Sequence, residues 1–174
     1  SAVMPTLLSA LCLFGGALLA FLLCLDDMEW FWTFHSGGDS RNPDASYEYL
    51  RSTLYTTDQN LADLLAAFAA QLFSHNSAIA IFAFALGFCF GIPTAVLLVY
   101  NGVYIGSFYA VFWQKGLGAA VTGWGVTHGV TELFAIVLAG AAGFMIGGAA
   151  AFPGKKSRMQ SMRDTGNEAA LVIM

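Results

Sequence analysis

Two long stretches of the chain carry no charged side chain, and this feature restricts the fold more than any other. Residues 1–25 contain no Asp, Glu, Lys or Arg, and neither do residues 64–114, where His75 is the only histidine. About 20 consecutive apolar residues span a bilayer as a helix, and both stretches reach that length. A membrane β-barrel shows short alternating segments instead. We therefore predict an all-α fold, a polytopic transmembrane helical bundle with interfacial helices.

The few charged residues are distributed unevenly along the chain. They make up 10% of it, against about 25% in a typical soluble domain. Eight of the 11 acids lie between Asp26 and Asp63, whereas four of the seven basic residues lie in the last 20 positions. Because basic segments stay on the cytoplasmic side, we expect residues 26–75 outside and residues 153–174 in the cytoplasm. Membrane lipid is an expected partner, and nothing indicates nucleic acid.

This pattern predicts five segments. They are a transmembrane helix at 1–25, an acidic extracytoplasmic loop at 26–57, an interfacial helix at 58–75, a transmembrane core at 76–152 and a basic cytoplasmic segment at 153–174. Within the loop, residues 45–54 are expected to form a short amphipathic helix. The Trp and Phe residues at 28–34 of the loop are typical of an interfacial belt, with a protein contact as the alternative. The apolar residues at both chain ends indicate a piece of a longer chain.

The transmembrane core is expected to contain polar joints and breaks. We place a polar joint at Asn76, a second span at 77–100 with a kink near Pro93, and a helix break at Asn101 and Gly102. To return the chain to the outside, residues 102–115 would form a short or broken, re-entrant helix, followed by a glycine-rich outer turn. Non-helical backbone at membrane depth must be covered by protein. The last span runs from about 121 to 152.

An ionisable pair, His128 and Glu132, lies inside this last span. Four residues separate the two, so a helix places both side chains on one face, one turn apart. Small residues share that face, and bulky ones cover the other, so we predict that the pair points into the bundle. Small residues let helices approach closely. The glycines predicted to pack helices together are Gly87, Gly91, Gly106, Gly125, Gly129 and Gly143.

Three interpretations of the pair remain open. The side chains bond to each other, to Asn76, to Asn101 or to a backbone carbonyl, and so hold helices together; or they line a water-filled path for protons or a solute. The third is metal binding or hydrolysis. Catalytic zinc commonly has three protein ligands, and the His-Glu-x-x-His motif is absent.

His35 and His75 are further ligands only if the fold brings them in. Ser107 and Cys89, the nucleophile candidates within the later helices, lack a recognisable sequence context. We therefore predict no catalytic residue, no metal and no cofactor, and we do not expect an enzyme.

Several local patterns also occur in a characteristic order. They are Asn76-Ser77, Gly87-xxx-Gly91, Asn101-Gly102-xxx-Gly106, His128-Gly129-xx-Glu132-Leu133, Ala139-Gly140-xx-Gly143 and Pro153-Gly154-xxx-Arg158. In this order they resemble the stage II sporulation protein M (SpoIIM) family of integral membrane proteins over about residues 75–170. Residues 1–74 match that family only in general plan.

The resemblance implies a role in the bacterial cytoplasmic (inner) membrane. The founding member of the family resembles a scaffold that anchors partners in the cell envelope. Many relatives are encoded beside MoxR-type ATPases and proteins of the von Willebrand type, which makes such proteins possible neighbours. We therefore expect a non-enzymatic integral membrane scaffold, able to form homo-oligomers. The alternative is a transporter or channel component that uses His128 and Glu132.

Overall fold

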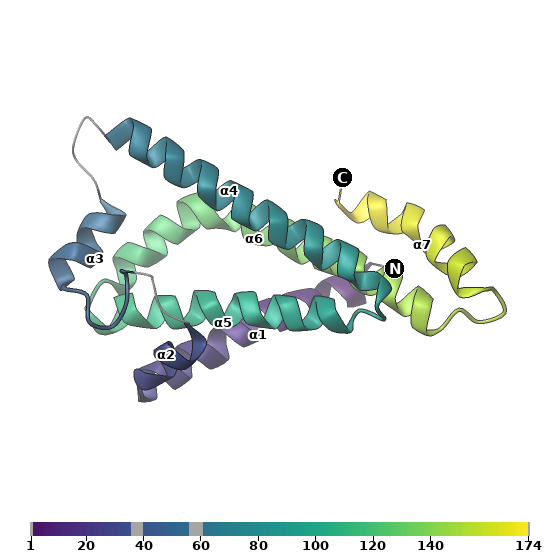
Figure 1. The fold of residues 1–174 in the computed structure, drawn as a ribbon, viewed down its shortest axis with the longest axis horizontal. Helices are drawn as coiled ribbons and strands as arrows, with labels where there is room; N and C mark the ends of the chain where they lie inside the picture. Colours follow the sequence, from purple (N-terminus) through teal and green to yellow (C-terminus); the bar gives the residue numbers. More distant parts are fainter. Residues whose placement is uncertain (1, 36–39, 56–60, 174) are drawn as a thin grey trace.

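Four long helices form the body of the molecule. The computed structural model describes residues 2–35, 40–55 and 61–173, and every regular element in these ranges is helical, which confirms the predicted all-α fold. Figure 1 shows the long helices lying along the long axis, with shorter helices at the two ends. The long helices are α1 (Val3–Asp26), α4 (Leu61–Ala85), α5 (Ile92–Gln114) and α6 (Gly118–Ala151).

Three of these helices are long and apolar enough to cross a membrane, among the residues that the structure describes. The spans are Val3–Asp26, Ile92–Gln114 and Gly129–Ala151, whereas a shorter apolar helical stretch, Phe73–Phe88, runs from α4 into the turn that follows it. With 34 residues, α6 is about 51 Å long at 1.5 Å per residue. That exceeds the roughly 30 Å hydrocarbon layer, so the part of α6 before Gly129 extends beyond its apolar span.

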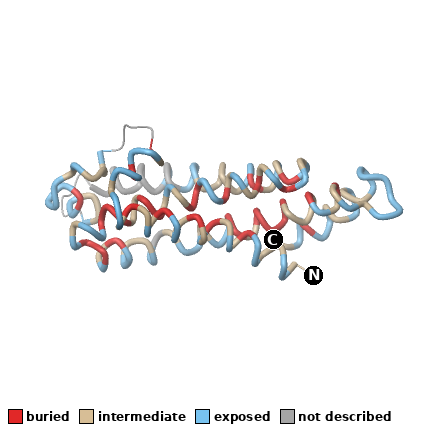
Figure 2. The backbone as a smooth tube through the Cα atoms, turned by 90° about the horizontal axis from the view of Figure 1, so that it is seen from below, coloured by how far each residue is buried: buried red, intermediate tan, exposed pale blue. Residues whose placement is uncertain are grey.

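Helix α1 divides cleanly into an inner and an outer stripe. Its buried residues are Ser9, Leu13, Gly16, Ala20 and Cys24, which recur every three or four positions. Its most exposed large side chains include Leu7, Leu11, Leu18 and Leu22, on the other side of the helix. Figure 2 shows the same division across the bundle, with buried residues along its inside. The outer stripe of α1 is suited to lipid.

The chain reverses direction between α4 and α5, and this corrects the predicted second span at 77–100. Helix α4 ends at Ala85, a short 3₁₀ turn, η1 (Leu86–Phe88), follows, and α5 begins at Ile92. Phe90 and Gly91 adopt left-handed φ angles of 62° and 75°, which turn the backbone. Pro93 lies in the first turn of α5, where its missing N–H leaves no hydrogen bond unmade. Pro93 therefore starts a helix and does not kink one.

Two predicted interruptions, at Asn101-Gly102 and at Asn76, are wrong because both lie inside continuous helices. Asn101 and Gly102 lie inside the unbroken helix α5, so the short or re-entrant helix at 102–115 is not found there. A Cβ on Gly102 would meet the backbone of Leu13 in α1, so this glycine is a packing contact. Asn76 also lies inside a continuous helix, α4, and is no joint. The first residues of the predicted interfacial helix at 58–75 lie outside the described residues.

The acidic end carries two short helices on a core of their own. Helix α2 (Glu29–Phe34) was not predicted, whereas α3 (Tyr47–Leu54) confirms the expected amphipathic helix and is capped by Ser46, which accepts from the Tyr49 amide. Their buried residues pack against the ends of α1, α5 and α6. We call this unit the acidic-end platform, and its core is formed by Cys24, Phe31, Leu50, Ala110, Val111, Phe112, Leu117 and Val121.

The basic end lies at the opposite extreme of the molecule, beside the N-terminus (Figure 1). Gly154, with a φ of 63°, turns the chain after α6, and α7 (Arg158–Ile173) then packs back against α6. Ala169 of α7 is fully buried in that contact. The acidic and basic segments of the sequence are thus separated by the length of the bundle.

Candidate functional site

A hydrogen bond between two long helices lies at the predicted site. The Asn76 side-chain amide of α4 donates to the Glu132 carboxylate of α6, and both residues are half-buried. Glu132 lies within the apolar span Gly129–Ala151. A carboxylate at that depth is costly unless it is hydrogen-bonded, and the amide provides one such bond. Asn76 is one of the partners that the sequence left open.

The second member of the predicted pair has a described backbone only. His128 lies one turn before Glu132 on α6, so both Cα atoms share a helix face. The His128 side chain lies outside the described residues, and its bond to Glu132 stays a prediction. The glycines beside it differ from expectation: a Cβ at Gly125 or Gly129 would meet no described atom within 4 Å. Among the described residues, neither glycine has the close helix contact that the sequence predicts.

The helix-face prediction for α6 is correct only in part. Val126, Val130 and Phe134 are exposed, and Ile136 is buried, as the pattern of small and bulky residues indicates. In the second half of α6, however, Val137 and Ala141 are also buried. They are buried because that half has neighbours on several sides, namely α1, α4, α5 and α7. One apolar stripe is too narrow to describe a helix so surrounded.

The remaining predicted glycines do hold helices together. A Cβ on Gly87 would fall on the backbone of Gly143, and one on Gly143 would meet the carbonyl of Ala83. A Cβ on Gly106 would overlap the backbone of Ala17 in α1. Gly91 faces the Phe144 ring and has the left-handed φ of the reversal. Such backbone-to-backbone approaches increase dispersion contacts between membrane helices.

Asn101 is a buried polar residue without a described partner. It is 6% exposed, and its amide nitrogen has no hydrogen-bond partner in the described part of the chain. It does not contact Glu132 through any hydrogen bond that the structure describes. The structure therefore brings Asn76 together with Glu132 and leaves Asn101 apart from that contact.

A second polar contact was missed by sequence reasoning. The His35 Nε2 lies 2.8 Å from the Ser107 Oγ of α5, across 72 residues of chain. The Ser107 hydroxyl is also 2.8 Å from the Val103 carbonyl oxygen and 3.1 Å from that of Tyr104. These two oxygens accept the hydrogen bond of its single O–H. Ser107 therefore accepts from an Nε2–H of His35. The His35 ring is 7% exposed, and it stacks on Phe31 at 4.1 Å between ring centroids.

This contact joins the acidic-end platform to a membrane span. Tyr104 covers the His35 ring at 4.4 Å, and the Arg41 guanidinium lies 4.7 Å from the Phe108 ring centroid. Ser107 is fully buried, and its hydroxyl donates a hydrogen bond to a backbone carbonyl. Only a weak sequence signal pointed to this contact. Phe31 and His35, next to two tryptophans, are spaced i, i+4 and so share a helix face.

The potential metal ligands are scattered in the structure. Among the described residues, no group of three or more His, Cys, Asp or Glu side chains lies close enough to hold a metal ion. His75 is exposed on α4, whereas His35 is buried at the acidic-end platform. The three cysteines, Cys12, Cys24 and Cys89, are free thiols.

Comparison with known proteins places the chain in a family. The family model described as stage II sporulation protein M matches residues 7–174. The match includes α1 and the acidic end, which the ordered motifs over residues 75–170 did not reach. No curated protein and no solved structure matches the chain. Because the family model covers nearly all of the sequence, this chain belongs to the stage II sporulation protein M (SpoIIM) family.

Proposed function

We propose that this membrane protein is a non-enzymatic scaffold within a complex of the cell envelope. We place it in the bacterial cytoplasmic membrane, with the acidic end outside and the basic end in the cytoplasm. Membership of a family that is not a known enzyme family supports the proposal. The separation of the acidic residues from the Lys and Arg residues of the last 20 positions supports the orientation.

One observation carries the proposal: the acidic-end platform has its own packed core. Phe31 and Leu50 are fully buried there together with Phe112 of α5, so the platform is fixed to the membrane spans. His35 and Ser107 add a buried hydrogen bond between them. A scaffold needs a surface held rigidly at one side of the membrane, and this arrangement provides one.

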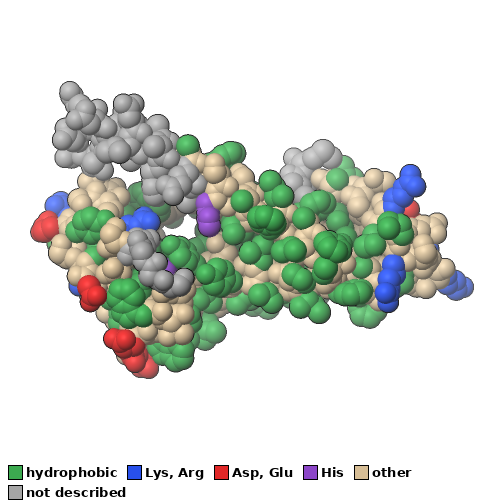
Figure 3. All heavy atoms as spheres, in the orientation of Figure 1, with side chains coloured by type: hydrophobic (Ala, Val, Ile, Leu, Met, Phe, Trp, Pro, Cys, Tyr) green, Lys and Arg blue, Asp and Glu red, His purple; other side chains and the backbone are tan. Residues whose placement is uncertain are grey.

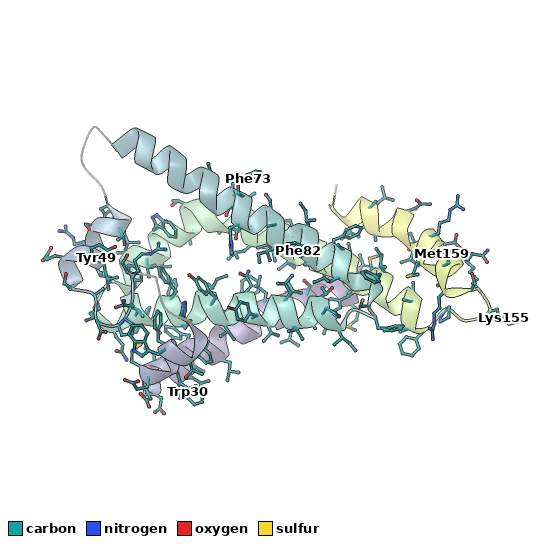
Figure 4. All side chains as sticks on the ribbon, in the orientation of Figure 1. Trp30, Tyr49, Phe73, Phe82, Lys155 and Met159 are labelled. Carbon is teal, nitrogen blue, oxygen red and sulfur yellow. The ribbon has the colours of Figure 1, made fainter. Side chains whose placement is uncertain are left out.

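The platform presents exposed aromatic side chains, which are enriched at protein interfaces. They are Trp30, Trp32, Tyr47, Tyr49 and Tyr55. Tyr47 and Tyr55 also line a shallow hollow between α3 and the turn from α5 to α6, together with Arg51 and Leu117. Figure 4 shows Trp30 and Tyr49 at this end of the molecule. We propose that envelope proteins dock here. MoxR-type ATPases or von Willebrand-type proteins are proposed as neighbours of the complex, not as occupants of this surface.

The experiment is co-purification from native membranes in mild detergent. Replacing both Tyr47 and Tyr55 by Ala is expected to reduce the recovered partners at least tenfold, because aromatic anchors dominate interface energies. Phe73→Ala on α4 is the control, since Phe73 is more exposed than either tyrosine but lies away from the platform. Full partner recovery by the doubly substituted, folded protein would remove the basis of this proposal.

A second candidate is a transporter or channel component, favoured by one observation. Glu132 lies in an apolar span, and its described hydrogen-bond partner is the uncharged Asn76. Carboxylates within membrane spans often mark the path of an ion or solute. Glu132→Gln is then expected to abolish a pH-dependent flux in proteoliposomes. If the wild-type protein produces no flux at all, this candidate is eliminated.

A further inference from the structure

Several Lys and Arg side chains lie together at the basic end, and none of them takes part in the helix contacts described above. Lys155, Lys156, Arg158 and Arg163 are all exposed, and between residues 152 and 173 only Asp164 and Glu168 oppose them. Figure 3 shows Lys and Arg side chains (blue) gathered at one end of the molecule and most of the visible Asp and Glu side chains (red) at the other. Lys156 pairs with Asp164 at 2.6 Å, but both side chains are about half exposed, and such a pair contributes little.

Large apolar side chains are exposed directly beside these cations. Phe88, Phe90 and Ile92 come from the reversal between α4 and α5, and Phe152 and Met159 flank the turn from α6 to α7. Phe152 is 85% exposed, more than any other large apolar residue that the structure describes. Figure 4 shows Lys155 and Met159 together at this end.

The membrane spans set the depth of these residues. One span begins at Ile92 and another ends at Ala151, and both ends lie at the basic end of the bundle. Phe90 and Phe152 therefore lie at the boundary between the hydrocarbon and the headgroups. Lys155 and Arg158 follow within six residues of Phe152, where lipid phosphates lie. Aromatic and basic side chains in this order are typical of a membrane interface.

Phe90 and Arg158 connect the two sequence segments of this surface. The Arg158 guanidinium lies 5.5 Å from the Phe90 ring centroid, although 68 residues separate them. Phe90 has a φ of 62°, an unusual conformation for a bulky side chain, and keeps its ring half exposed. Backbone outliers of this kind occur at ligand-binding positions as well as at turns. The conformation places an aromatic ring beneath a cation at the membrane boundary.

We propose that this surface binds the phosphate groups of anionic phospholipids, with Phe90 and Phe152 set into the interface below them. Arg158 is suited to bidentate contact with a phosphate, and the lysines add positive charge. The charge favours an anionic occupant, and the exposed aromatic rings at the ends of two spans favour a lipid over an acidic protein. The inference is independent of the scaffold proposal.

The test uses native mass spectrometry of the full chain in mild detergent, with equal amounts of phosphatidylglycerol and phosphatidylcholine. The wild-type protein is expected to retain phosphatidylglycerol preferentially. Each cation near an anionic lipid changes binding by roughly fivefold, so replacing Lys155, Lys156 and Arg158 by Gln should reduce that preference at least tenfold. Lys115→Gln, at the opposite end of α5, is the matched control and should keep it.

Two further arms separate the lipid from other occupants. Phe152→Ala should lower the binding of both lipids, whereas Phe73→Ala should not, and both side chains are too exposed to be needed for folding. Inorganic phosphate in millimolar excess should leave the bound lipid in place. Equal retention of the two lipids by the wild type, an unchanged preference after the triple substitution, or displacement by inorganic phosphate would each overturn the proposal. Arg158→Gln alone replaces the triple variant if that variant aggregates.

Discussion

The two halves of α6 use glycine in different ways. Toward the basic end, Gly87 and Gly143 bring the backbones of neighbouring helices into direct contact. In the first half of α6, a Cβ at Gly123, Gly125 or Gly129 would meet no described atom within 4 Å. A glycine in a membrane helix therefore indicates close packing only where the facing helix also offers backbone or a small side chain.

Polar side chains connect the segments where the glycines do not. Asn76 bonds to Glu132 in the acidic half, and His35 bonds to Ser107 near the platform. The basic half contains a polar contact as well, from the Thr94 hydroxyl to the Ala83 carbonyl at 2.8 Å, but there the backbones already touch. Glycine backbone contacts thus hold one half together and side-chain hydrogen bonds the other, so substitutions can weaken each half separately.

The largest effect is expected from filling a glycine contact. Gly143→Leu places a side chain on the backbone of Ala83, which cannot move aside, so we expect a loss of about 3 kcal/mol or more in the free energy of unfolding. Gly125→Leu, the matched control, should stay within about 0.5 kcal/mol. Unfolding in mixed micelles by SDS titration measures both. Similar losses in the two variants would show that the halves do not differ.

An intermediate effect is expected from the intramembrane amide. Asn76→Leu removes the donor to Glu132 and should cost about 1–2 kcal/mol. Asn101→Leu changes the same residue type at a buried position where the amide nitrogen has no described partner, and should be neutral or stabilising. The same SDS titration compares them, and a double-mutant cycle with Glu132→Leu isolates the bond. An equal cost for the two asparagines would count against a specific bond.

The smallest effect is expected at the platform. Ser107→Ala leaves the buried His35 Nε2–H without its acceptor and should cost about 1 kcal/mol. Because the loss is local, the amides of α2 should exchange hydrogen faster, while those of the glycine-packed half keep their rates. Ser52→Ala is the control, since that exposed hydroxyl bonds to a backbone carbonyl, as that of Ser107 does, but accepts from no described side chain. Unchanged α2 exchange would mean that the hydrophobic core alone holds the platform.

Much of the fold was predictable because membrane spans depend on composition. The uncharged runs predicted α1 and the all-α class, and the charge asymmetry distinguished the two ends. The reversal was missed because Phe88, Cys89 and Phe90 include none of the polar residues that mark turns in soluble proteins. Asn101 and Gly102 look like such a turn but lie within a helix, where Gly102 packs against α1.

The candidate site was predictable only where partners lie close in the sequence. The spacing of His128 and Glu132 shows that they share a helix face, but not which neighbour reaches them. Asn76 is 56 residues from Glu132, and His35 is 72 residues from Ser107. Contacts over such separations depend on how the helices are rotated and packed, which hydrophobic periodicity does not determine.

The reversal at Phe90 and Gly91 has a consequence for the angular phase of α5. The Gly91 amide donates to the Gly87 carbonyl at 2.9 Å, so the turn is tied to η1 and fixes where α5 starts. Each residue of a helix advances about 100° around its axis. One added residue that the turn did not absorb would rotate Gly102 and Gly106 off α1 and Ser107 away from His35. A turn at the basic end thereby sets the alignment of a contact at the acidic end.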